Sequence, residues 1–289
     1  MYIRIIVPVL IALVSSTGCD ESVNPVLGID KSFTAYGFFN PLADTQAVRI
    51  FPIENQLVRT GTEPIDAQLI AEALETGRTF TWQDSLVRFQ DGSYGHVFWS
   101  AFRPEFEQTY RLQITNANDG FAQVQAQVPA FIEPEEQAPE AGILNRVVLP
   151  IIWRGAPQLP AVRVTYFFNV GEFSLSYVLE KEQVEGGWRV PIQLSRDAGA
   201  AFFVLRDHIG SDGRLVLQDI EIRSVIGNDA WTSPIGIFDA ELLVEPGTFS
   251  NVEDGFGFVG AGYVSALRWL PDRDVLTQAG FLLPEEEEE

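Results

Sequence analysis

Cys19 is the residue whose setting most clearly predicts chemistry, because it is the only cysteine among 289 residues. Arg4 precedes an apolar run from Ile5 to Val14, and the small residues 15–18 lead into the cysteine. A basic start, an apolar segment and small residues before a cut are typical of a secretory signal peptide. The sequence therefore predicts an exported chain from which residues 1–18 are removed.

The same stretch resembles a bacterial lipoprotein signal, in which the cysteine takes a diacylglyceryl group and becomes the N-terminus. Thr17 and Gly18 fit that pattern, and Ser16 stands where Leu is usual. The resemblance implies lipid attachment at Cys19 and a lipidated tether over 19–30; two or three acyl chains such as palmitate hold a protein stably on a membrane. A chance cysteine beside an ordinary signal is the alternative.

A retained helical anchor does not fit the apolar run of ten residues, Ile5 to Val14. Ten helical residues cover roughly 15 Å of a hydrocarbon core that is about 30 Å thick. Asp20 and Glu21, directly after the cysteine, resemble the acidic starts of surface-exported lipoproteins in Bacteroidetes-type bacteria. A merely solvated tether is the other interpretation of those two carboxylates.

Catalytic and metal-binding patterns are sparse in this chain. His96 and His208 are the only histidines, too few nitrogen ligands for a zinc site unless carboxylates join them. Asp212 and Gly213 partly match a calcium loop, but a turn before a strand is favoured. No nucleophile elbow, Walker loop or zincin helix is present. We expect no catalytic residue, no metal and no cofactor, although 40 carboxylates leave a carbohydrate-active hydrolase open.

Tryptophan side chains are the remaining candidates for ligand contact, since indole rings can stack on sugars. Most of them lie in alternating strands, where core packing is the default. Trp231, between turn residues in NDAWTSP, is expected to be exposed. Trp231 and Trp99 are therefore the candidate ligand-contacting residues, for a ligand that the sequence does not identify.

The formal net charge of −21, with a pI near 4.4, limits the partners of the chain. Such a field disfavours nucleic acids and bare anionic lipid surfaces. Lys31 and Lys181 are the only lysines among 19 basic residues, a composition typical of proteins in concentrated salt, where screening removes self-repulsion. Without residues 1–18 the chain holds no cysteine pair, so no disulfide braces it.

The first strand-rich block runs over 31–132 and alternates with period two. Gln108–Asn116 and Phe121–Pro129 are the clearest half-buried strands, with Asn118-Asp119-Gly120 as the turn between them. About seven short strands favour an immunoglobulin-like or fibronectin III-like β-sandwich. Tyr110 is either the corner tyrosine of such a sandwich or an ordinary core aromatic.

The rest of the chain contains a linker, a second strand-rich block and a tail. The run EPEEQAPEA, 133–141, predicts an acidic Pro/Glu linker or exposed crossover. Strand patterns continue over 142–283, including AAFFVL and FDAELLVE, with a bulge near Gln218 and Asp219. Residues 284–289, PEEEEE, predict a disordered acidic tail. The predicted fold class is all-β, with two antiparallel β-sandwich-like domains after a lipoprotein signal peptide.

Several stretches resemble a family of Bacteroidetes-type lipoproteins that is known only as a domain of unknown function. They are FTAYGFFNPLADTQAVRI, DGSYGHVFWSAFRPEFEQTYRLQI and, most specifically, SNVEDGFGFVGAGY over 250–263. The family carries no established catalytic residue or ligand. Its members are often encoded near TonB-dependent outer-membrane receptors, so the resemblance implies an accessory role in uptake or surface binding.

The glycines of the 250–263 stretch alternate with aromatic and apolar residues. Glycines in a strand allow close backbone approach or a bend, whereas a phosphate cradle would need a following helix with a free N-terminus. The close-approach interpretation is favoured.

We expect a non-catalytic binding or accessory lipoprotein of the outer membrane, facing the periplasm or the cell surface. Its partners would be the membrane, through the anchor, and a possible TonB-dependent receptor. A carbohydrate-active hydrolase or a structural envelope protein is the alternative.

Overall fold

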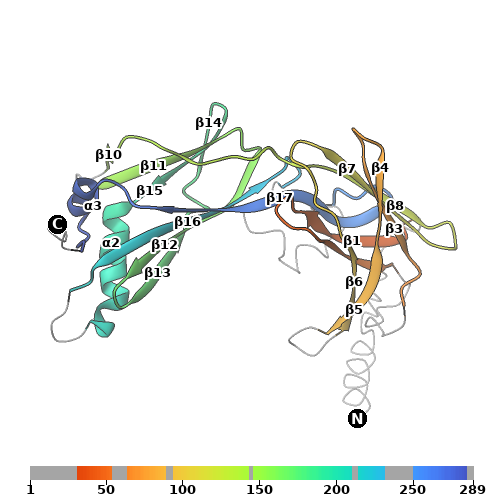
Figure 1. Ribbon diagram of the computed structural model, residues 1–289, viewed down its shortest axis with the longest axis horizontal. Coiled ribbons are helices and arrows are strands. Elements are labelled where there is room, and N and C mark those ends of the chain that lie inside the picture. The colour runs from red at the N-terminus through yellow and green to blue at the C-terminus, as the bar shows by residue number, and fades with distance from the viewer. Residues whose placement is uncertain are drawn as a thin grey trace, which may run out of the picture. The chain divides into compact units, whose positions relative to one another are not determined.

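The computed structural model describes residues 31–53, 64–88, 94–142, 146–209, 214–231 and 250–284. Over these ranges the chain is built of strands with two short α-helices, which confirms the all-β fold class (Figure 1). The predicted signal peptide, Cys19, the predicted tether, the predicted turn at 211–213, the predicted strand FDAELLVE and residues 285–289 lie outside the described residues.

The first eight strands form two sheets with the strand order of an immunoglobulin domain. One sheet is ordered β1-β2-β6-β5 and the other β4-β3-β7-β8, which corresponds to strands A-B-E-D and C′-C-F-G of that fold. The strands are β1 (Phe33–Phe39), β2 (Gln46–Pro52), β3 (Gln68–Ala73), β4 (Arg78–Thr81), β5 (Gln83–Arg88), β6 (Tyr94–Ser100), β7 (Thr109–Thr115) and β8 (Phe121–Gln127).

Tyr110, at the start of β7, has the geometry of a tyrosine corner. Its ring is buried in the first core, and its hydroxyl accepts a hydrogen bond from the backbone N–H of Glu105 at 3.0 Å. A tyrosine near the start of strand F that bonds to backbone a few residues upstream is a feature of immunoglobulin-like domains. The corner interpretation of Tyr110 is therefore correct, and the ring is a core aromatic as well.

A long C-terminal strand, β17 (Gly255–Trp269), completes this sandwich at the free edge of β1. Its first half pairs in parallel with β1, from Phe33 opposite Gly255 to Phe39 opposite Ala261. Val259 and Ala261 point into the first core. The second half of β17 pairs antiparallel with β16 (Leu217–Gly227), so one strand belongs to two sheet regions (Figure 1).

The glycines of β17 are required by close approach. Gly257 has φ +104°, and a Cβ there would lie 2.1 Å from the carbonyl oxygen of Ala35. A Cβ on Gly262 would lie 2.5 Å from the carbonyl oxygen of Ile226 and 3.0 Å from the ring of Trp231. The close-approach interpretation is confirmed, and the phosphate cradle was wrong because a strand, not a helix, follows the glycines.

A second pair of sheets encloses its own core. The sheet order is β13-β12-β16-β17 on one side and β10-β11-β15-β14 on the other, with β9 also paired to β11. Trp153 of β11 is fully buried and donates its indole N–H across the core to Ser224 Oγ of β16 at 3.1 Å. The strands are β9 (Glu135–Glu136), β10 (Glu140–Ala141), β11 (Val147–Arg154), β12 (Gln158–Phe168), β13 (Gly171–Ser176), β14 (Glu182–Val184) and β15 (Gly187–Ile192).

The described residues from Lys31 onward belong to one compact unit that contains both cores. The predicted linker 133–141 supplies β9 and β10, each paired with β11. The domain limits drawn at 132 and 142 stay a prediction.

Two helices differ from the predicted elements. AAFFVL, which we predicted as a strand, lies in α2 (Leu194–Leu205), followed by a 3₁₀ turn, Arg206–His208. The buried residues of α2 recur at helical spacing, but one of them is charged, and this masks the apolar period: Leu194, Asp197, Ala201 and Leu205. The short helix α3 (Arg273–Ala279) was not predicted.

The predicted bulge is confirmed in β16. Phe167 of β12 pairs with Asp219 and Phe168 pairs with Leu217, so Gln218 has no partner in the ladder. An extra residue on one strand of a pair is what a bulge requires.

Candidate functional site

The outer face of the sheet β17-β1-β2-β6-β5 gathers aromatic side chains. Phe33, Ala35, Ile50 and Phe98 point into the core, so the alternate residues of the same strands point outward. We call this outward set the aromatic face; its rings are Tyr36, Phe38, Phe51, Trp99, Phe256 and Phe258, and Trp231 packs on them.

The strand register places these rings in two rows with a small residue in the middle of each. In one row Phe256, Thr34 and Phe51 lie side by side on β17, β1 and β2. In the other, Phe38, Ala47 and Trp99 lie side by side on β1, β2 and β6. Both rows run across the strands.

Trp231 lies beneath this surface. Its ring centroid is 5.8 Å from that of Phe38 and 5.7 Å from that of Phe258, and both pairs meet edge to face. Only 6% of Trp231 is exposed. Our expectation of an exposed Trp231 was wrong, because Gly227 and Gly262 leave room for the indole to sink against the backbone. The buried Trp231 ring packs against Phe38 and holds that ring in place.

Trp99 is partly exposed and is held in one orientation. Its indole N–H donates to Ser85 Oγ on β5 at 3.0 Å. Ala47 and Gln83, its neighbours on the adjoining strands, are exposed. The two tryptophans predicted from the sequence therefore lie on the same face of one sheet. Trp99 is partly exposed there, and Trp231 is buried. Whether either contacts a ligand stays a prediction.

The charges on the aromatic face are positive. The exposed Arg49 guanidinium lies 4.9 Å from the ring centroid of Phe51, and Lys31 Nζ lies 4.4 Å from that of Phe256. The outward positions of the five strands, as far as the structure describes them, carry no carboxylate. This contrasts with a chain of net charge −21.

His96 lies on the inner side of the same sheet. It is 4% exposed, and its Nδ1 lies 2.8 Å from Asp84 Oδ2. Its Nε2 is buried, with no hydrogen-bond partner among the described residues. A His–Asp pair orients an imidazole, but within the part of the chain that the structure describes no hydroxyl or thiol meets Nε2. His208 lies in the exposed 3₁₀ turn after α2.

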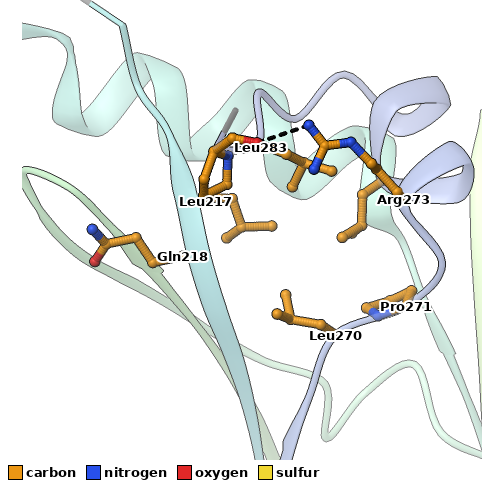
Figure 2. A pocket seen from close by; sticks show the side chains of 8 residues that line it. Leu217, Gln218, Leu270, Pro271, Arg273 and Leu283 are labelled. Atoms are coloured by element: carbon orange, nitrogen blue, oxygen red, sulfur yellow. Dashed lines mark hydrogen bonds between the residues drawn. The ribbon is translucent and has the colours of Figure 1, made fainter. Parts of the chain in front are cut away.

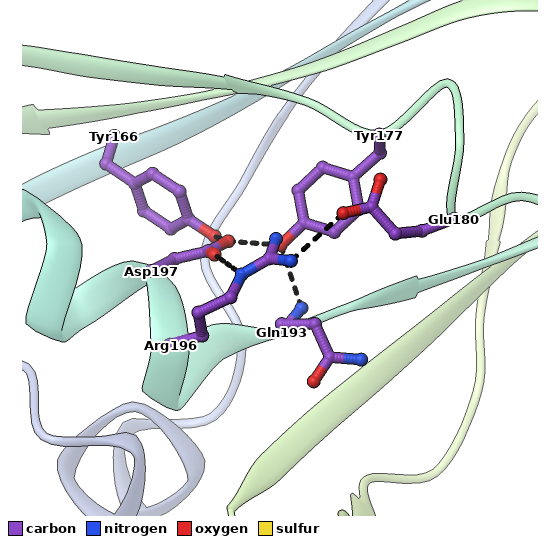
Figure 3. Close-up of polar contacts among 6 residues, drawn as sticks. All are labelled: Tyr166, Tyr177, Glu180, Gln193, Arg196 and Asp197. Carbon is purple, nitrogen blue, oxygen red and sulfur yellow. Dashed lines mark hydrogen bonds and ion pairs between the residues drawn. The ribbon is translucent and has the colours of Figure 1, made fainter.

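A buried polar cluster joins α2 to the second sheet pair (Figure 3). Asp197, fully buried, accepts at Oδ2 from the hydroxyls of Tyr166, at 2.6 Å, and Tyr177. Arg196 Nε donates to Asp197 Oδ1 at 3.0 Å, and its other side pairs with Glu180 at 3.0 Å. Sequence reasoning missed this cluster, because Tyr166 and Asp197 are 31 positions apart and the members have no motif spacing.

The electrostatics of this cluster indicate a structural role. Burial raises the pKa of Asp197, against the lowering effect of its bonds from Tyr166, Tyr177 and Arg196. Burial, with the Asp197 charge beside it, also raises the pKa of Tyr166 well above 10. Both carboxylate oxygens of Asp197 accept hydrogen bonds from other side chains, so the cluster fixes α2 against β12.

A small pocket lies between the start of β16, the end of β17 and α3 (Figure 2). Its volume is about 180 Å³, and leucines and prolines line most of it. Arg273, at its rim, donates to the carbonyl oxygen of Pro284 at 2.7 Å. Small-molecule pockets measure roughly 300–1,000 Å³, so this hollow is below the usual size.

The described part of the chain contains neither a clustered set of metal ligands nor a helix that could span a membrane. It contains no group of three or more His, Cys, Asp or Glu side chains placed to hold a metal ion. Neither of its helices has the length and apolar character needed to cross a bilayer.

Comparisons with known proteins add little. No protein-family model matches the chain, and no curated protein matches it. The crystal structure of bovine butyrophilin is similar at a TM-score of 0.21 and 10% sequence identity, over 66% of this chain and 91% of that chain. The immunoglobulin-like strand order is established by the sheets described above.

Proposed function

We propose that this protein is a membrane-anchored bacterial lipoprotein that acts as a non-catalytic binding or accessory module, with the aromatic face as its contact surface. The observation that carries the proposal is the row of partly exposed rings, Phe38 and Trp99 about exposed Ala47, on the outside of an immunoglobulin-like sheet.

The aromatic residues on the solvent-facing side of this sheet support a binding role. One side of an antiparallel sheet packs on the core, and the other side usually carries polar residues in water. An aromatic array on the water side marks an interaction site, and Tyr, Trp, Phe and Arg are the residues enriched where proteins bind partners. Arg49 and Trp99 belong to this set, and both are accessible.

The anchor is proposed from the sequence. Acylation at Cys19 would keep the binding face beside the outer membrane, where a TonB-dependent receptor is the proposed partner. Mass spectrometry of the native protein tests the anchor: an N-terminal diacylglyceryl-cysteine is expected, and an unmodified thiol within an intact N-terminus would refute it.

A pull-down of the lipidated protein from native membranes tests the accessory role. We expect a β-barrel transporter to co-purify and Trp99→Ala to reduce its recovery several-fold. Phe203→Ala is the matched control, because that ring is 65% exposed on α2, away from the aromatic face. Equal recovery with wild type and Trp99→Ala would remove the aromatic face from the proposal, and consistent absence of a transporter would remove the accessory role.

A further inference from the structure

We propose that the outer side of α2 is a contact surface for a second copy of this chain, with the Phe203 ring of each copy packed over Gly199 of the other. The inference goes beyond the proposed function, because α2 carries none of the rings of the aromatic face. It draws on two independent observations, the apolar side chains that α2 exposes and the open space over its glycine.

The C-terminal end of α2 exposes three apolar side chains in succession. Phe202, Phe203 and Val204 are 58%, 65% and 53% exposed. Asp197, the only acidic residue of the helix, is fully buried. A surface helix normally turns its charged residues to the solvent, and a helix that is apolar all round is normally buried. This distribution therefore indicates that a further surface covers the outer side of α2.

Gly199 and Phe203 occupy the middle of that outer side. Residues four apart lie above one another on a helix, and both residues are exposed, opposite the buried positions 194, 197, 201 and 205. Arg196 lies on the same side, but its guanidinium is bonded to two carboxylates (Figure 3). Arg206 lies 4.5 Å from the centroid of the Phe203 ring, and Phe203 is still 65% exposed. A glycine and a phenyl ring, one turn apart, are thus available for contact.

Gly199 has no packing role among the described residues. A Cβ at this position would meet no atom within 4 Å, and its φ is not positive. Glycine inside a helix lowers stability relative to alanine, so a glycine that nothing crowds is a cost to the single chain. What it provides is a gap in the outer side of α2, one turn before Phe203. A ring from outside the chain can pack into that gap against the helix backbone.

A second copy supplies the ring that fits this gap. Two copies related by a twofold axis meet through identical surfaces, and each contact occurs twice. When two α2 helices lie antiparallel with the axis midway between Gly199 and Phe203, the Phe203 ring of each copy lies over Gly199 of the other. The contact is a knob packed into a hole, the arrangement by which helices interlock. The surface is therefore complementary to itself.

The charges of α2 permit this contact in an otherwise acidic chain. Two copies with a net charge of −21 repel each other. The outer side of α2 carries no carboxylate of its own, since Asp197 is buried, so the repulsion is weakest where the copies meet. A single pair of helices is smaller than a standard interface of about 1,600 Å². We therefore expect a weak complex that tightens with salt, because salt screens the remaining repulsion.

Recovery of one full-length copy through a tag on another tests the contact. Two differently tagged copies are co-expressed, extracted from membranes in mild detergent and purified through one tag. We expect the other copy in the eluate, and several-fold more of it at about 0.5 M than at about 0.05 M NaCl. Phe203→Ala in both copies should reduce recovery at least about fivefold. Val264→Ala is the matched control, because that apolar side chain is 54% exposed on β17, and recovery should be unchanged.

Gly199→Leu separates a specific contact from general adhesion. Leucine is a better helix former than glycine and its side chain meets open space, so the fold is retained, which circular dichroism checks. The added side chain occupies the place of the other copy's Phe203 ring, so recovery should fall as far as in Phe203→Ala. Adhesion through exposed apolar surface would instead increase. Equal or greater recovery with Gly199→Leu, or no recovery of the wild-type copy at about 0.5 M NaCl, refutes the second copy.

A bilayer is the other occupant that exposed phenyl rings could meet. Flotation of the full chain carrying Cys19→Ser with phosphatidylcholine vesicles tests it. Vesicle binding that Phe203→Ala removes and Gly199→Leu strengthens would refute the second copy. Transporter recovery depends on the aromatic face of each copy and should be the same in Phe203→Ala and wild type, so failure of the proposed function and failure of this contact are separate results.

Discussion

Replacing Tyr166 by Phe tests the polar cluster that fixes α2, and the structure gives the expected size of the effect. Tyr166 donates to a fully buried carboxylate at 2.6 Å. A hydrogen bond to a charged group contributes roughly 1.5–3 kcal/mol. The phenyl ring of the variant keeps its stacking on Phe281, at a centroid distance of 5.4 Å, so no cavity opens. We expect the free energy of unfolding to fall by about 2 kcal/mol at neutral pH.

The pH dependence of that loss is the sharper test. The pKa of Asp197 is raised in the folded state, so the folded protein binds more protons than the unfolded chain between the two pKa values. The contribution of this group to stability therefore decreases as pH rises through that window. Once Asp197 is protonated, the bond from Tyr166 joins neutral groups, worth about 0.5–1.5 kcal/mol. The loss in Tyr166→Phe should shrink toward acid pH.

Urea unfolding followed by circular dichroism at several pH values measures both quantities. Thr79→Val, which removes a hydroxyl from an exposed residue of β4, is the control and should change stability by less than about 0.5 kcal/mol. A loss below about 0.5 kcal/mol for Tyr166→Phe at neutral pH, or one that grows on acidification, would refute the reasoning. A double-mutant cycle with Asp197→Asn would then show whether the two groups are coupled.

Three more predictions follow from described contacts. The pKa values of Tyr166 and Tyr177 are raised above 10 in the folded state. The stability that these two phenols contribute is therefore complete below pH 10 and is lost progressively as the pH rises above 10. Absorbance at about 295 nm should show both phenols titrating only when the protein unfolds. Gly257→Ala should lower the free energy of unfolding by more than about 2 kcal/mol, because φ is +104° there and the carbonyl oxygen of Ala35 occupies the place of the Cβ. Gly199→Ala is the control: a Cβ on this α2 residue meets no atom, so the free energy of unfolding should rise by about 0.5–1 kcal/mol. Urea unfolding measures both changes. Asn251→Ala should cost about 1–3 kcal/mol by thermal melting, since that amide bonds the N–H and C=O of one β17 residue.

Local patterns predicted the local structure well. Period-two alternation located β7 and β8, and the turn at Asn118–Gly120 joins them. The bulge at Gln218 followed from a change of apolar phase within one strand. The turn residues Glu185-Gly186-Gly187 predict a hairpin with Tyr177–Glu180 beside Trp188–Leu194, and the turn does join two strands. The strand paired with β15 is Glu182–Val184, however, and not Tyr177–Glu180. These features depend on residues that are close in sequence, so they can be predicted from the sequence alone.

The helix α2 and the burial of Trp231 could not be predicted from the sequence, because both depend on residues that are distant in the chain. Asp197 can be buried on α2 because the hydroxyls of Tyr166 and Tyr177 and the guanidinium of Arg196 donate hydrogen bonds to it. In the sequence alone, a charged residue at this buried position interrupts the apolar pattern that would predict a helix. Trp231 lies among turn residues, which predicts exposure, yet the space for its ring is made by glycines of two other strands. Such neighbours cannot be read from the residues beside it.

The glycine-rich stretch over 250–263 supplies residues both to the first core and to the proposed contact surface. Its pairing with β1 joins residues 222 positions apart, Phe33 and Gly255, so no local pattern could predict it. The alternation of this stretch serves two sides of one sheet: Val259 and Ala261 fill the first core, and Phe256 and Phe258 join the aromatic face. A protein that lost this strand would lose an edge of its immunoglobulin-like sandwich and half of one ring row together, so fold and binding should be lost in step.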